Sequence, residues 1–147
     1  MLVLLDSGPL GLLSNPTTTG EPREIREWAL QLLDAGATIV VPEIADYEVR
    51  RELIRADKAN GIRRLDRLTE GFAFEPLRTS HFRRAARLWA DARNRGLPTA
   101  HDAALDGDVL LAAQAIELEG LHPETVVVTT NPKHLETFIR ALRWRDF

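Results

Sequence analysis

Cysteine is absent from the 147-residue sequence, which excludes disulfides, thiolate zinc sites and cysteine nucleophiles. This absence is compatible with a reducing compartment, and we expect a cytoplasmic protein. No apolar run approaches the roughly 18 residues that a membrane-spanning helix needs, so we expect no membrane association. The start also lacks the basic stretch and cleavage site of a signal peptide, and we interpret Leu2–Leu5 as a strand.

Several common catalytic motifs are also missing. The sequence has no Gly-x-Gly-x-x-Gly fingerprint, no P-loop and no Gly-x-Ser-x-Gly elbow. Its four histidines have none of the spacings typical of zinc sites. A strand ending in Asp6 also fits an aspartyl-phosphate enzyme, but such enzymes usually carry a second Asp where this chain has Gly8.

Charge is unevenly distributed along the chain. Residues 50–95 hold 13 of the 19 basic residues and 6 of the 22 acidic ones, a balance of +7 against −10 for the rest. This asymmetry predicts a basic surface beside an acidic centre, although solvated helix faces would give the same pattern. The arginines that we expect to bind nucleic acid are Arg50, Arg51, Arg55, Arg83, Arg84 and Arg87.

The length fits a single domain over residues 1–147. Short apolar runs predict strands at residues 2–5, 38–41, 72–77 and 125–130. Helical patterns alternate with them, which predicts a three-layer α/β/α domain around a mostly parallel sheet of four or five strands.

The helical patterns also predict boundaries and buried faces. We expect one helix from Pro22 to Gly36, a second from Ile44 to Asp57 that is broken at Asn60-Gly61, and a short third helix over 62–69. A fourth helix should begin at a Thr79 or Ser80 cap and end at Gly96-Leu97-Pro98, and a fifth should cover 108–119 before Gly120. The expected buried residues are Ile25, Trp28, Ala29, Leu32 and Leu33, then Phe82, Ala85, Ala86, Trp89 and Ala92, then Leu111, Ala112, Ala115 and Leu118.

Three acids lie where strands end or apolar helices run. Asp6 follows the first strand, although an Asp that caps the next turn would look the same. Glu48 is four residues after Ile44 and shares its helix face, where Arg51 and Glu52 are placed to orient it; an exposed helical Glu is the plainer alternative.

Asp108 opens the apolar run 109–113, and the alternative is a first-turn acid, a role that Asp106 or Asp102 would also fill. With Asn131, which follows the last strand, these acids are predicted to converge on one divalent cation. Mg²⁺ and Mn²⁺ favour carboxylate oxygens, and a cation removes the repulsion between clustered acids, activates a water and neutralises charge on a phosphate.

These residues, in this order, resemble a PIN domain, the nuclease fold of many prokaryotic VapC-type toxins. The resemblance is carried by residues 4–7, by Val41-Pro42 with Glu48, by residues 93–98, by 108–113 and by 127–131. Many members carry Asp-Phe three residues after the final Asn, where this chain has His134-Leu135. The resemblance implies Mg²⁺- or Mn²⁺-dependent cleavage of RNA, often a homodimer, and in toxins a small antitoxin partner.

We therefore interpret the chain as a metal-dependent ribonuclease. Asp6, Glu48 and Asp108 would hold the metal, Asn131 and His134 would support it or orient a water, and Ser7 and Thr130 would bond a carboxylate or the phosphate. Two alternatives remain: a catalytically weak PIN domain that binds RNA or a protein, and a small metal-dependent phosphatase.

Overall fold

The computed structural model describes residues 1–96 and 102–147 and contains a five-stranded, all-parallel sheet. In spatial order the strands are β3 (Ala73–Glu75), β2 (Thr38–Pro42), β1 (Leu2–Leu5), β4 (Thr125–Val128) and β5 (Ala141–Leu142). The central strand β1 pairs Leu4 with Val40 of β2 and Leu5 with Val128 of β4. The sheet predicted from the sequence is thereby confirmed.

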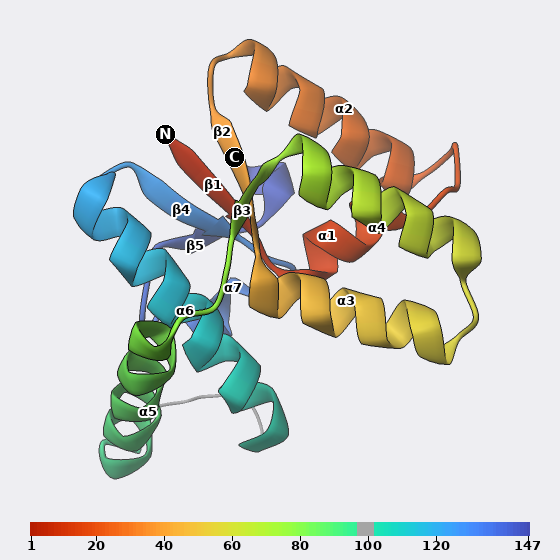
Figure 1. Cartoon of the computed structure of the whole chain (residues 1–147). Coiled ribbons are helices and arrows are strands. Elements are labelled where there is room, and N and C mark those ends of the chain that lie inside the picture. The colour runs from red at the N-terminus through yellow and green to blue at the C-terminus, as the bar shows by residue number, and fades with distance from the viewer. Residues whose placement is uncertain (97–101) are drawn as a thin grey trace.

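Helices cover both faces of this sheet (Figure 1). The described helices are α1 (Ser7–Ser14), α2 (Glu21–Asp34), α3 (Glu43–Arg55), α4 (Ala59–Gly71), α5 (Thr79–Asn94), α6 (Asp102–Leu121) and α7 (Pro132–Leu135), followed by a 3₁₀ turn, η1 (Trp144–Asp146). None of these helices is both long and apolar enough to cross a membrane.

Two cores show how the layers are built. Val3, Leu5 and other inward residues of β1, β2 and β4 pack against α1, α2 and α4 on one face. Leu4 and the alternate strand residues pack against α6 on the other face, as the period of two along a strand requires. The three-layer α/β/α arrangement predicted from the sequence is therefore confirmed.

Helix α3 lies where these two cores meet. Its residue Ile44 joins the α6 side, whereas Ala45 and Val49 join the α1 side. Helix α3 therefore passes along the edge of the sheet where β2 ends. It faces both α1 and α6 and is in contact with each of them. This position lets one helix present side chains toward residues from both layers.

The break predicted at Asn60-Gly61 is wrong. Helix α3 ends instead at Arg55, the chain turns through Asp57 with a φ of 54°, and Asn60-Gly61 lies in the first turn of α4. Glycine is needed at position 61 for space rather than for a turn, because a Cβ there would lie 2.8 Å from the Leu53 side chain.

The predicted buried face of α5 is right for Ala85 and Ala92 but wrong for the other three residues. Phe82 and Trp89 are 52 % and 39 % exposed, and Ala86 is exposed as well, while the buried residues are His81, Ala85 and Ala92. The reason is that α5 packs on α6 rather than on the sheet, and small residues such as Ala85 allow the close approach of two helices.

Smaller differences concern the ends of α5 and the buried face of α2. The residue before α5 is Arg78, whose backbone N–H donates to His81 Nδ1 at 3.0 Å, so the predicted Thr79 or Ser80 cap is wrong. Leu33 of α2 is 40 % exposed, although Ile25, Ala29 and Leu32 are buried as predicted. Gly96 follows α5 as predicted, and Leu97-Pro98 lie outside the described residues.

Helix α6 begins six residues earlier than predicted, at Asp102, and continues through Gly120 to Leu121. Asp108 therefore lies in the body of the helix, which removes the alternative that it serves as an N-cap. Leu111, Ala112 and Ala115 face inward as predicted.

Candidate functional site

Asp6 is fixed at the carboxyl end of the central strand. Its backbone continues the ladder with β4, since its N–H donates to the Val128 carbonyl at 2.9 Å. The carboxylate also caps α1, because Oδ1 accepts the Ser7 N–H at 2.7 Å. The turn-capping role and a place at the sheet edge are thus combined in one residue rather than being alternatives.

Thr129 holds the other oxygen of Asp6, and the sequence prediction missed it. Its Oγ1 donates to Asp6 Oδ2 at 2.6 Å and accepts the Asn131 N–H at 3.1 Å. The strand register was the missing signal: since Leu5 pairs with Val128, the next residues of the two strands are neighbours. Thr130, which was predicted to bond a carboxylate or the phosphate, is exposed and lies against Gly8. A Cβ added to Gly8 would be 2.7 Å from Thr130 Cγ2.

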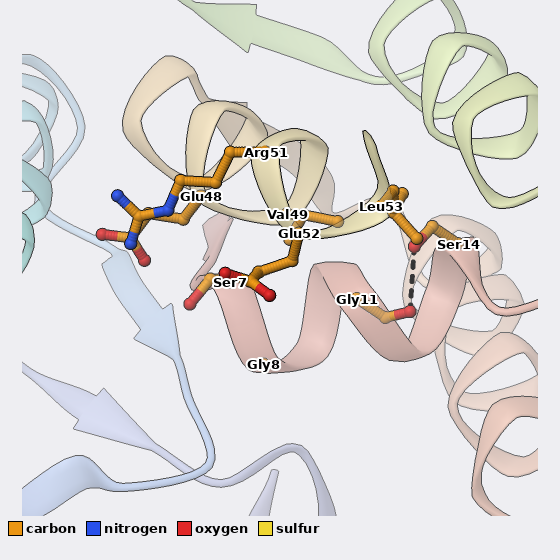
Figure 2. A pocket seen from close by; sticks show the side chains of 9 residues that line it. All are labelled: Ser7, Gly8, Gly11, Ser14, Glu48, Val49, Arg51, Glu52 and Leu53. Carbon is orange, nitrogen blue, oxygen red and sulfur yellow. Dashed lines mark hydrogen bonds between the residues drawn. The ribbon is translucent and has the colours of Figure 1, made fainter. Parts of the chain in front are cut away.

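Glu48 extends from α3 toward the same edge. Burial raises the pKa of its carboxyl, the Ser7 hydroxyl opposes that shift, Asp6 adds to it and Arg51 lowers it again. Figure 2 draws the ends of the Glu48 and Arg51 side chains next to one another, which agrees with this influence on the pKa. Glu48 is therefore not an exposed helical Glu but a half-buried acid within electrostatic range of Asp6.

The pKa of the Asp108 carboxyl is raised strongly. Burial raises its pKa to about 7, with further contributions from the negative charges of Asp6 and Glu48. Its Oδ2 is buried and has no hydrogen-bond partner among the described residues, and His134 Nδ1 is 3.9 Å away from it. The three acids thus influence one another although they come from β1, α3 and α6.

Asn131 and His134 lie beside these acids at the start of α7. Asn131 Nδ2 is 3.2 Å from His134 Nε2, and the His134 ring faces Asp108. Asp106 is exposed, and it is two residues from Asp108, so it projects from a different side of α6. The structure therefore places Asn131 and His134 with the acids and gives Asp106 no such contact.

The six arginines predicted to bind nucleic acid have different surroundings. Arg50 is bound by Asp46 at 2.8 Å and Asp66 at 2.7 Å, which raises its pKa above the ordinary value. Arg55 pairs with Glu52, and Arg51 lies over the Tyr47 ring at 5.1 Å. On α5, Arg84 is 3.8 Å from Glu117, while Arg83 and Arg87 are exposed.

The donor set fits a hard divalent cation by its chemistry. Three carboxylates converge, one of them with an orphaned buried oxygen, and burial without a counter-charge is costly. Within residues 1–96 and 102–147, however, no three acidic or histidine side chains are gathered as closely as around a bound ion. Asp6, Glu48 and Asp108 are thus candidates to hold a cation, for which their carboxylates would have to come closer together.

A groove of about 400 Å³ opens beside these acids, between α1 and α3 (Figure 2). Small residues of α1 form one side, and Ser14 Oγ donates to the Gly11 carbonyl at 2.9 Å. The residues that line it are Ser7, Gly8, Gly11, Ser14, Glu48, Val49, Arg51, Glu52 and Leu53. The acids Glu48 and Glu52 and the cation Arg51 therefore border an open surface.

The sequence matches the PIN domain family over residues 17–137, and the chain belongs to that family. This finding confirms the resemblance stated from the motifs. No curated protein matches the chain.

Solved structures confirm the fold. A chain of VapBC2 from Rickettsia felis, crystallised with a DNA fragment from the promoter, superposes with a TM-score of 0.72 at 18 % identity, covering 98 % of this chain and 99 % of that one. VapBC-1 from nontypeable Haemophilus influenzae and FitAcB from Neisseria gonorrhoeae each give 0.69, at 16 % and 15 % identity, with 99 % of each chain covered. The chain is thus similar in architecture to chains of VapBC2, VapBC-1 and FitAcB.

Proposed function

We propose that this chain is a Mg²⁺- or Mn²⁺-dependent ribonuclease. The observation that carries the proposal is the approach of three acids from β1, α3 and α6, among which Asp108 has a buried oxygen with no hydrogen-bond partner in the described residues and a pKa raised to about 7. Such a perturbed group in a cluster of acids is typical of a functional site. Membership of the PIN domain family supports nuclease chemistry at this position.

Asp6, Glu48 and Asp108 would hold the cation in this proposal. When bound, a divalent cation would relieve their repulsion, acidify a water and neutralise charge that develops on the phosphate. Asn131 and His134 would orient that water; the support is that His134 Nδ1 is 3.9 Å from Asp108 Oδ2 and Asn131 Nδ2 is 3.2 Å from His134 Nε2. The Ser7 hydroxyl, which already interacts with Glu48, would bond a ligand carboxylate or the phosphate, as would Thr130.

RNA is the proposed substrate, and exposed arginines would hold its backbone. Arg83 and Arg87 are candidates because they lie one turn apart on α5. Arg51 borders the groove beside Glu48 and is a second candidate. Arg50 is bound between two acids, so its proposed RNA contact would require it to leave them.

We further propose that the protein is the VapC-type toxin of a cytoplasmic toxin–antitoxin pair, bound by a small antitoxin and acting as a homodimer. The support is architectural, since the similar structures are of VapBC and FitAcB, one of them with promoter DNA. Co-expression with the product of a short neighbouring reading frame would test the pairing. If the purified chain does not carry the co-expressed product with it, the proposed pairing is contradicted.

The decisive experiment is cleavage of end-labelled RNA with Mn²⁺, with EDTA, and by the Asp108→Asn variant. Cleavage that needs Mn²⁺ and is lost in the variant is expected. Metal-independent cleavage, or full activity of the variant, would overturn the proposal. A phosphomonoester substrate should remain intact, whereas its hydrolysis would favour a phosphatase.

A binding module without catalysis is the second candidate. It is favoured by His134, which stands where many family members have an acid, and by the lack of a tightly gathered acidic cluster in the described residues. The same experiment separates the two functions, because a binding module would retain RNA in a filter assay and leave it uncut with Mn²⁺.

A further inference from the structure

Gly107, directly before Asp108 in α6, lies against the Glu48 carboxylate. A Cβ built on Gly107 would overlap Glu48 Oε1 and lie 3.3 Å from Glu48 Cδ. Real Cβ atoms do not approach other heavy atoms so closely. The Glu48 carboxylate therefore occupies the space that any other residue at position 107 would fill with its own side chain.

The backbone conformation does not explain this glycine. Gly107 lies inside α6 and has no positive φ, so an alanine would suit the helix better than glycine does. Gly120 in the same helix differs, because nothing lies within 4 Å of the Cβ position there. What is special at position 107 is therefore the contact with Glu48.

We propose that Gly107 is a positioning residue: its missing side chain lets the Glu48 carboxylate lie against α6, beside Asp108. The inference rests on the proposed metal-dependent function, since its purpose is to set the separation of two ligands from different helices. Mutual influence of the two acids supports the placement, because Glu48 contributes to the raised pKa of Asp108.

The atom in contact decides what Gly107→Ala would do. Glu48 Oε1 is the far end of a flexible side chain, so the added methyl group would displace the carboxylate rather than the helix backbone. The variant should fold, with Glu48 turned away from Asp108. A loss of metal affinity without a loss of stability is thus the signature of positioning.

The experiment measures Mn²⁺ affinity by electron paramagnetic resonance and urea unfolding in EDTA. It compares the parent chain, Gly107→Ala, Glu48→Gln, the double variant, and Gly120→Ala as the matched control. We expect Gly107→Ala to weaken Mn²⁺ binding about tenfold or more, and Gly120→Ala to leave it unchanged. In the Glu48→Gln background, Gly107→Ala should have little further effect, because the displaced ligand is already lost.

Each outcome has a defined meaning. Parental Mn²⁺ affinity in Gly107→Ala would overturn the positioning role, as would an equal loss in the Glu48→Gln background. Absence of Mn²⁺ binding by the parent chain would instead overturn the proposed function. If Gly107→Ala does not fold, the Gly107→Ala, Glu48→Ala variant is examined: recovery of folding supports the contact, and continued unfolding overturns it.

Discussion

At the scale of single residues, the environment of Asp108 predicts an unusual dependence of stability on pH. Its pKa is raised from 3.8 to about 7 in the folded protein, so between these values the folded state binds more protons than the unfolded state. The metal-free protein should therefore lose stability as pH rises from about 4 to about 7. Above pH 7 the charged carboxyl remains a cost.

Asp108→Asn should remove much of that dependence and raise the free energy of unfolding at pH 8 by about 1–2 kcal/mol. The gain stays below the full value of the shift, because the amide of Asn is also a polar group that has to be buried. Urea unfolding in EDTA at several pH values measures it, with the exposed Asp106→Asn as control. An Asp108→Asn variant that keeps the parental slope would show that Asp108 is not the titrating group.

Thr129 offers a second test at the same scale. Thr129→Val keeps the shape but removes the 2.6 Å hydrogen bond to Asp6 and the acceptor for the Asn131 N–H. We expect a loss of about 1–2 kcal/mol in the free energy of unfolding, as for hydrogen bonds to a charged group. Thr130→Val should change it by less than about 0.5 kcal/mol, since that side chain is exposed. Equal effects would contradict the assignment.

At the scale of elements, Arg50 joins α3 to α4 through Asp46 and Asp66. Arg50→Ala should lower the free energy of unfolding by about 1 kcal/mol, because both acids lose their partner. Arg55→Ala removes only an exposed pair within α3 and should cost less than about 0.5 kcal/mol. Urea unfolding of the two variants measures this difference, and a costlier Arg55→Ala would reverse the ranking.

The elements also show which parts of the fold can be predicted from sequence. Helix α2 packs on the sheet, so its apolar spacing correctly predicted Ile25, Ala29 and Leu32 as buried. Helix α5 packs on another helix, where close approach favours alanine and leaves Phe82 and Trp89 outside. Periodicity reports that a face is apolar, but it does not report which neighbour a helix will have.

At the scale of the whole molecule, metal binding should couple to folding. A cation held by Asp6, Glu48 and Asp108 binds only the folded state, because the three acids meet only there. We expect Mn²⁺ to raise the melting temperature of the parent chain, and to raise it less in Asp6→Asn and in Glu48→Gln. An equal rise in all three proteins would place the bound ion elsewhere.

The candidate site was predicted from sequence to the extent that strand ends and helix faces reveal it. Asp6, Glu48 and Asp108 were found because each adjoins an apolar pattern, and the structure brings them into mutual electrostatic range. Thr129 and Gly107 were missed because their contacts with Asp6 and Glu48 depend on strand register and on the approach of two helices. Such distances follow from tertiary packing, which no local spacing encodes.

The hydrogen bond between Thr129 and Asp6 spans 123 residues of sequence, and this has a consequence for synthesis. A growing chain has Asp6 from the start but gains Thr129 only 123 residues later, so the site is incomplete until β4 has been made. A chain stopped before Thr125 should show no Mn²⁺-dependent rise in melting temperature and no RNA cleavage. A rise in melting temperature or cleavage of RNA by that chain would contradict the prediction. If the proposed function is right, nuclease activity would therefore appear only once β4 has joined the sheet.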